Sequence, residues 1–113
     1  KVDRHLQVSE FSRQMKIMAK DLKVPVIALS QLNRQSESRG DREPRLSDLR
    51  ESGAIEQDAD VVILLRREEL DGHTYLNPNE QLVLDVAKNR HGETGIVELS
   101  WQGRYSRAVE WDS

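Results

Sequence analysis

The sequence contains no cysteine, only three prolines and six glycines, and few aromatic residues, which make up 4% of its 113 residues. A chain without cysteine forms neither disulfide bonds nor thiolate metal sites, and its three scattered histidines lack the spacing of a metal-binding motif. Trp101, Tyr105 and Trp111 lie on a closing hairpin pattern, so we expect them to pack in the core or at a sheet edge. These absences fit a reducing, intracellular compartment.

Long hydrophobic runs are also missing, since no stretch is long and apolar enough to span a bilayer. The first residues, KVDRHLQVSE, do not show the charged and then apolar pattern of a secretion signal. The net charge of -3 and the isoelectric point near 5.6 argue against a chain that binds nucleic acid through a wholly basic surface. We therefore expect a cytoplasmic protein without membrane contact, in which any contact with nucleic acid is local.

The length of 113 residues allows one small domain, which buries only a modest fraction of its surface. The chain begins with Lys1 rather than methionine, and its last strand-like pattern ends close to Ser113. We therefore expect a segment of a longer protein.

Two patterns occupy the first 30 residues. Apolar residues at helical spacing predict an amphipathic helix over residues 4–22, with Asp3 as its N-cap. The run VPVIALS, residues 24–30, is nearly all apolar and too short for a helix. Because the run does not alternate, we expect a strand that is covered on both faces in a parallel sheet.

The remaining residues predict polar loops and strands. We expect loops, a helical turn and four strands at residues 31–47 (loop), 54–59 (helical turn), 60–66 (strand), 67–80 (loop), 81–88 and 96–101 (hairpin strands) and 106–111 (edge strand). This order is typical of the second half of an α/β sheet domain, in which ligands lie beyond the carboxyl ends of the strands. The polar residues 30–34, which include Gln31, are therefore candidates for a site.

The stretch KNRHGETG holds Lys88 and Arg90 one residue apart at the end of an alternating pattern. Rigid mounting of this kind suits a side chain that must reach a phosphate or a neighbouring subunit. A hairpin turn that only needs to be soluble has a similar composition. From the residues alone, the better interpretation of Gln31 is a polar strand end that caps the loop, and the arginines and glutamates of the long loop are a solvated surface with weak ion pairs.

The blocks EFSRQMKIMAKDLKVPVI, ALSQLNR, DLRESGAIEQDADVVILL and AKNRHGETG occur in this order over essentially the whole chain. Together they resemble the back half of the RecA-like motor domain of DnaB-type replicative helicases, the hexameric superfamily 4 group. The resemblance implies an α/β fold, namely the C-terminal part of a RecA-like, P-loop NTPase domain. Its sheet would be mainly parallel with an antiparallel hairpin at its end, and residues 1–113 would form a partial motor domain.

The resemblance also implies roles for residues in the first half of the chain. Gln31 corresponds to the γ-phosphate sensor, for which an amide is suited because it hydrogen-bonds without adding charge. Arg50, Glu51 and Gly53 correspond to a loop that holds single-stranded DNA through backbone amides and phosphate contacts without reading bases.

Lys88 and Arg90 correspond to a basic pair that projects toward the ATP of the neighbouring subunit. Arg90 would be the arginine finger, which stabilises charge on the transferred phosphoryl group in trans. The family usually has RNGPTG here, whereas this chain reads RHGETG, with His91 for asparagine and Glu93 for proline. Since Glu93 can pair with Arg90 and divert it, we expect slower hydrolysis with the finger role retained, and a Glu93→Pro substitution tests this.

The sequence contains no G-x-x-x-x-G-K-[ST] phosphate loop, and we interpret Glu10, Asp58 and Asp60 as helix-face or strand-edge carboxylates rather than metal ligands. ATP and Mg²⁺ would therefore be bound mainly by an upstream half, and the chain alone would be inactive. The resemblance implies a nucleoid-associated homohexamer on single-stranded DNA, with primase and a helicase loader as candidate partners.

Two alternatives remain. Another RecA-like ATPase ring is disfavoured by the combination of SQLNR with DLRESGAIEQDAD. A non-catalytic truncated relative that binds DNA or a helicase would also lack the phosphate loop.

Overall fold

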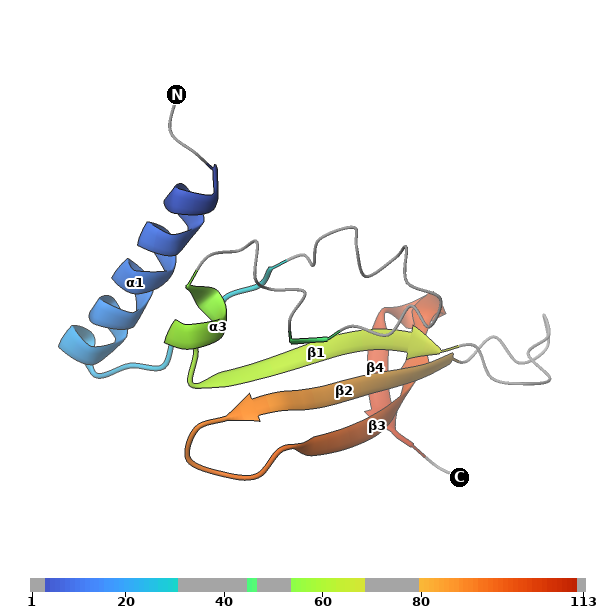
Figure 1. The fold of residues 1–113 in the computed structure, drawn as a ribbon. Coiled ribbons are helices and arrows are strands. Elements are labelled where there is room, and N and C mark those ends of the chain that lie inside the picture. The colour runs from blue at the N-terminus through green and yellow to red at the C-terminus, as the bar shows by residue number, and fades with distance from the viewer. Residues whose placement is uncertain (1–3, 31–44, 47–53, 69–79, 112–113) are drawn as a thin grey trace.

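The computed structural model describes residues 4–30, 45–46, 54–68 and 80–111 (Figure 1). The elements of these ranges are α1 (Arg4–Leu22), α3 (Ile55–Asp58), β1 (Val61–Glu68), β2 (Glu80–Asn89), β3 (Gly95–Gln102), the 3-10 helix η2 (Gly103–Tyr105) and β4 (Arg107–Glu110). The predicted helix, the helical turn and the four predicted strands from residue 60 onward are confirmed to within one or two residues. Asp3, the expected N-cap, lies outside the described residues.

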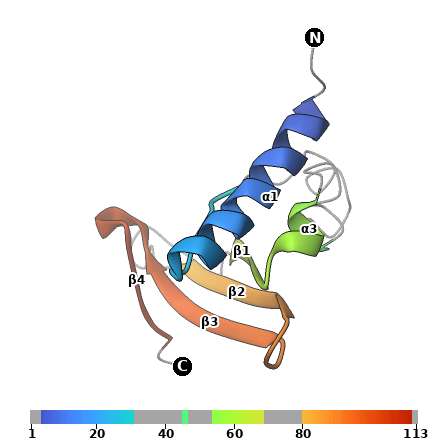
Figure 2. The same ribbon diagram turned by 90° about the vertical axis from the view of Figure 1, so that its left-hand side faces the viewer.

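The four strands form one antiparallel sheet in the order β1-β2-β3-β4. The tight turn after Asn89 joins β2 to β3, as the pattern NRHGETG predicts. Both helices lie over the end of the sheet where β1 begins and β2 ends, as the two ribbon views show (Figures 1 and 2). The two helices α1 and α3 and the strands β1 and β2 therefore meet at this corner of the molecule.

The core lies on β1 and β2, and Val83 of β2 is its most buried residue, at 1% exposed. Val62 and Leu64 are only 7% and 4% exposed, and the partly buried residues packed against them are Leu46, Ile55, Ala59 and Ala87. The alternate residues Val61, Ile63 and Leu65 are about half exposed. Within the described residues, the apolar run of β1 is thus covered on one face only, as expected for a strand of period two.

Residues 24–30 are not a strand in this structure, which corrects the prediction made from VPVIALS. Every strand pair among the described residues is antiparallel, and the described sheet ends at β1, so the segment has no ladder to join. Its apolar side chains are exposed, with Ile27 at 89% and Leu29 at 94%. We call Val24, Val26, Ile27 and Leu29 the apolar strip.

The end of α1 sets where this strip begins. Lys23 adopts a left-handed conformation, with φ of 55°. The Lys23 amide donates to the Lys20 carbonyl at 3.3 Å, and the Val24 amide donates to the Ala19 carbonyl at 3.1 Å. This is the Schellman arrangement that ends many helices, here with lysine at the position where glycine is usual.

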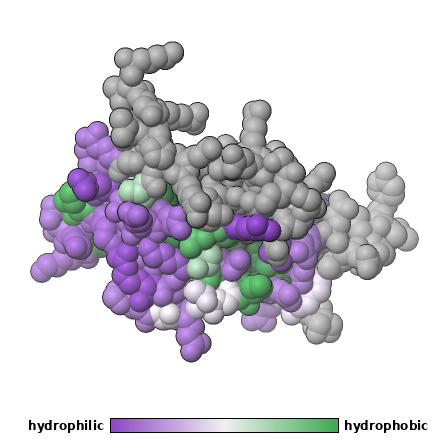
Figure 3. Space-filling model, in the orientation of Figure 1, coloured by the Kyte–Doolittle hydropathy of each residue, from purple (hydrophilic) through white to green (hydrophobic). Residues whose placement is uncertain are grey.

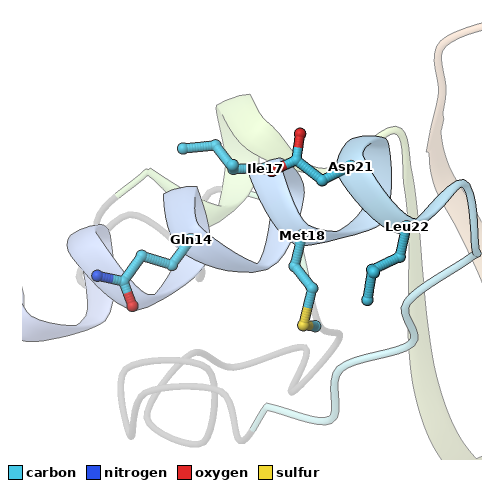
Figure 4. A pocket seen from close by; sticks show the side chains of 5 residues that line it. All are labelled: Gln14, Ile17, Met18, Asp21 and Leu22. Atoms are coloured by element: carbon cyan, nitrogen blue, oxygen red, sulfur yellow. The ribbon is translucent and has the colours of Figure 1, made fainter.

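Helix α1 does not bury the face that its apolar periodicity indicates. Ser12 is 6% exposed, whereas Phe11 and Leu22 are each 63% exposed and Met18 is 45% exposed. A shallow groove of about 340 Å³ runs along the exposed side, lined by Gln14, Ile17, Met18, Asp21 and Leu22, with Met18 and Leu22 pointing the same way (Figure 4). The apolar patches interrupt an otherwise hydrophilic surface (Figure 3). No helix in the described ranges has both the length and the apolar character needed to cross a membrane.

The three aromatic residues near the end of the chain differ in burial. Trp101 and Trp111 are partly buried, but Tyr105 is 65% exposed, with the guanidinium groups of Arg104 and Arg107 at 5.8 and 5.4 Å from its ring centre. The expectation of packing at a sheet edge therefore fits the tryptophans better than the tyrosine.

Candidate functional site

Lys88 owes its direction to an irregularity between β1 and β2. Val62 pairs with Lys88, but Ile63 pairs with Val86, so Ala87 is one extra residue on β2. Directly opposite residues of an antiparallel pair point to the same face of the sheet. The bulge therefore places Lys88 on the face of Val62, which is the buried face beside α3.

The ammonium group of Lys88 reaches the backbone of α3. Its Nζ donates to the carbonyl oxygen of Glu56 at 2.7 Å and to that of Gln57 at 3.3 Å. A helix leaves its last carbonyl groups without partners inside the helix, and cationic side chains commonly satisfy them. Lys88 is thus anchored on its own chain rather than projecting freely from the hairpin.

Arg90 follows β2 directly and lies opposite Asp60. The Arg90 amide donates to the Asp60 carbonyl at 2.8 Å, which extends the ladder beyond the Val61–Asn89 pair. The guanidinium makes two further contacts, from Nη1 to Asp60 Oδ1 at 2.6 Å and from Nη2 to the Gln57 carbonyl at 2.9 Å. Both the backbone and the side chain of Arg90 are therefore bound to the residues just before β1.

A third cation comes from α1. Lys16 Nζ donates to the Asp58 carbonyl at 2.8 Å and to Asp60 Oδ1 at 3.0 Å. The buried Ser12 Oγ donates to Asp58 Oδ2 at 3.0 Å and ties the same two elements together. We call Lys16, Asp58, Asp60, Lys88 and Arg90 the polar corner. In it, three cationic side chains satisfy the carbonyl oxygens at the end of α3.

The carboxylate of Asp60 is the shared acceptor of this corner. The hydrogen bond from Lys16 lowers the pKa of Asp60 below its ordinary value of 3.8. Desolvation acts in the opposite direction, and the positive charges of Lys16, Arg90 and His91 lower the pKa further. Asp60 is therefore ionised at neutral pH.

A cleft of about 540 Å³ opens beside the polar corner, lined by Lys16, Ala19, Lys20, Val24, Asp60, Arg90 and His91. Its lining carries three basic side chains and a histidine against one carboxylate, and such N–H donors suit phosphate oxygens. Among the described residues there is no group of three or more side chains that could hold a metal ion. Among the described residues, this lining therefore suits an anion rather than a metal ion.

The structure brings together two of the six residues singled out from the sequence, Lys88 and Arg90. The others, Gln31, Arg50, Glu51 and Gly53, lie outside the described residues.

The carboxylate that pairs with Arg90 is that of Asp60 rather than that of Glu93. Glu93 instead accepts a hydrogen bond at its backbone oxygen from Asn89 Nδ2, at 3.1 Å. Sequence reasoning identified Asp60 only as a strand-edge carboxylate. The antiparallel register, which sets Asp60 opposite Arg90, is the signal that identifies the pair.

Comparison with known proteins shows relatives over nearly the whole chain. The family model described as DnaB-like helicase C terminal domain matches residues 1–110. The chain is 58% identical over 108 residues to the replicative DNA helicase DnaB of Leifsonia xyli subsp. xyli, covering 95% of this chain and 23% of the relative. It is 52% identical over 104 residues to the replicative DNA helicase DnaB of Mycobacterium intracellulare, and the match covers 92% of this chain and 18% of the relative. The chain thus spans about a fifth of the length of these curated relatives.

Two solved structures are similar as well. The "ATPase Domain of G40P" has a TM-score of 0.83 at 42% identity, covering 99% of this chain and 39% of that one. "The Structure Of A DnaB-Like Replicative Helicase And Its Interactions With Primase" has a TM-score of 0.84 at 42% identity, and the match covers 99% of this chain and 26% of that one. These likenesses confirm the predicted α/β fold of a RecA-like ATPase domain.

Proposed function

Because the chain belongs to the DnaB-like helicase C-terminal domain family, we propose that it is a segment of an ATP-dependent replicative DNA helicase. In this proposal residues 1–113 are part of a motor domain that works as a homohexameric ring, translocates on single-stranded DNA and separates duplex DNA. The segment supplies parts of two sites, and an upstream half supplies the phosphate loop. Primase is a proposed partner because one similar structure is described with it, and a helicase loader is a further one.

The observation that carries this proposal is the rigid mounting of Arg90. Its backbone is fixed to the β1–β2 ladder, its guanidinium is bound to Asp60, and the residue lines the basic cleft. Because charge spreads over the phosphoryl oxygens during transfer, a fixed guanidinium supplied by a neighbouring subunit stabilises that charge and makes hydrolysis depend on assembly. Lys88, two residues earlier, adds positive charge beside it.

Two further roles rest on the family resemblance. Gln31 senses the γ-phosphate, and Arg50, Glu51 and Gly53 hold the DNA backbone. In the sequence, Gly53 directly precedes Ala54, the N-cap residue of α3, whose other end binds Lys88 and Arg90. ATP, with Mg²⁺, is bound mainly by the upstream half, and a magnesium ion bound there neutralises phosphate charge.

A hybrid protein tests the proposal. In this hybrid helicase, our chain replaces the matching segment of the Leifsonia xyli relative, which is 58% identical. The unsubstituted hybrid should hydrolyse ATP in the presence of single-stranded DNA. Arg90→Ala should lower kcat about a thousandfold, the lower end of the range for arginine fingers. Arg104→Ala, which removes an exposed arginine on η2, is the matched control and should leave kcat unchanged.

Two results would contradict the proposal. An assembled hybrid that binds ATP but does not hydrolyse it would favour the alternative function, a non-catalytic module that binds DNA or a helicase. Hydrolysis that survives Arg90→Ala would remove the finger role.

A further inference from the structure

We propose that Asp60 is a positioning residue that sets the direction in which Arg90 meets the phosphate of the neighbouring subunit. This inference rests on the proposed function of Arg90 as the finger. Asp60 touches neither nucleotide nor DNA in this account, and it acts only through the arginine.

The first support is that Asp60 binds Arg90 twice. Its backbone oxygen accepts from the Arg90 amide at 2.8 Å, and its Oδ1 accepts from Nη1 at 2.6 Å. A free arginine side chain has many rotamers, and a charge-assisted bond of this length restricts them. Together with the contact from Nη2 to the Gln57 carbonyl at 2.9 Å, these bonds fix the direction of the guanidinium relative to the β1–β2 ladder.

The second support is that the docked guanidinium keeps donors to offer. An arginine has five N–H groups, and the contacts with Asp60 and the Gln57 carbonyl use one on Nη1 and one on Nη2. The remaining N–H groups can bind phosphate oxygens while the side chain stays docked. The contact is therefore compatible with catalysis in trans.

The third support is that Asp60 is itself held in place. Lys16 binds the same Oδ1 at 3.0 Å and the Asp58 carbonyl at 2.8 Å, and Ser12 holds the Asp58 side chain at 3.0 Å. The carboxylate thus sits between cations from α1 and from the hairpin. With its side chain 57% exposed, Asp60 still competes with water for these bonds, so its loss should matter less than the loss of Arg90 itself.

The test is a double-mutant cycle of ATP hydrolysis in the hybrid helicase. Asp60→Asn keeps the shape and removes the charge, and it should lower kcat about tenfold with little change in KM, because a misdirected group costs rate rather than ground-state binding. In the Arg90→Ala background the same substitution should have no further effect. Asp60→Glu should restore part of the lost rate. Glu110→Gln, which removes an exposed carboxylate on β4, is the matched control.

A second readout does not depend on activity. In the 113-residue chain, nitrogen-15 relaxation of the Arg90 Nε–H group should show a more mobile side chain after Asp60→Asn than after Glu110→Gln. An unchanged kcat, an unchanged mobility or a further loss in the Arg90→Ala background would each overturn the positioning role. Faster hydrolysis after Asp60→Asn would also overturn it, since the contact would then be inhibitory. Arg90→Ala alone tests the finger, so the two failures are distinguishable.

Discussion

The polar corner and the apolar strip differ in whether the described chain provides contact partners for their side chains. In the polar corner, Lys16, Lys88 and Arg90 all find acceptors at the end of α3 or on Asp60. In the apolar strip, Ile27 and Leu29 stay almost fully exposed. An apolar side chain stabilises a protein only where other atoms cover it. The described chain therefore supplies the partners of its polar corner, but it gains little stabilisation from its apolar strip.

The largest effect on stability is expected for a substitution in the core beneath the polar corner. Leu64 is 4% exposed, so Leu64→Ala should lower the free energy of unfolding by about 2–5 kcal/mol, from lost burial and the cavity left behind. The matched substitution in the apolar strip, Leu29→Ala, should change it by less than about 0.5 kcal/mol. Urea unfolding of both variants of the 113-residue chain measures the difference. Equal losses would show that the strip is covered in solution.

A smaller effect is expected where α1 meets the polar corner. Ser12→Ala removes a buried hydroxyl that donates to the Asp58 carboxylate, and it should cost about 1.5 kcal/mol, the lower end for bonds to charged groups. Urea unfolding measures this cost. A double-mutant cycle with Asp58→Asn should show coupling between the two sites. Additive losses would mean that the bond contributes nothing of its own.

Lys23 stands between the two regions and should respond in the opposite direction. Its φ of 55° is unfavourable for a side chain with a Cβ atom and favourable for glycine. Lys23→Gly should therefore raise the free energy of unfolding by about 0.5–1 kcal/mol. Thermal unfolding is a suitable measurement, with Lys20→Gly inside α1 as a destabilising control. Destabilisation by Lys23→Gly would contradict the left-handed helix end.

The smallest effect concerns pH, because Asp60 is exposed to solvent. Its pKa is lower in the folded chain than the ordinary 3.8, chiefly through the hydrogen bond from Lys16. The stability that it contributes is therefore complete above the unfolded-state pKa and is lost as pH falls through the lower folded-state value. The charged groups that face it are Lys16, Arg90 and His91.

Unfolding measured in urea from neutral to acidic pH should show this loss in the unsubstituted chain. Asp60→Asn should flatten that part of the profile. Identical profiles would mean that the carboxylate has the same pKa in both states.

The sequence predicted the elements whose pattern is local. The helix at 4–22 and the strands of the hairpin follow from periodicity and turn chemistry, and the structure confirms them. The predicted strand at 24–30 was wrong, because a strand needs hydrogen-bonded neighbours and the described sheet provides none there. Apolar spacing also did not show that Ser12, rather than Phe11, faces inward.

The candidate site, too, could be predicted from the sequence only in part. Lys88 and Arg90 were found through a family resemblance, whereas their partners depend on register. Asp60 and the carbonyls of α3 become partners only through the Val61–Asn89 pairing and the extra residue Ala87. Neither feature is visible in the order of residues, because each depends on which residues of two strands lie opposite one another.

We propose that Arg90, held by the polar corner, completes an ATP site on the neighbouring subunit. The most direct measurement mixes two forms of the hybrid helicase that are each inactive. One carries Arg90→Ala, and the other carries a disabled phosphate loop in its upstream part. Mixed rings contain interfaces with an intact loop on one side and an intact arginine on the other, so ATP hydrolysis should reappear and peak near equal amounts. No hydrolysis at any ratio, in rings shown to contain both forms, would contradict action in trans.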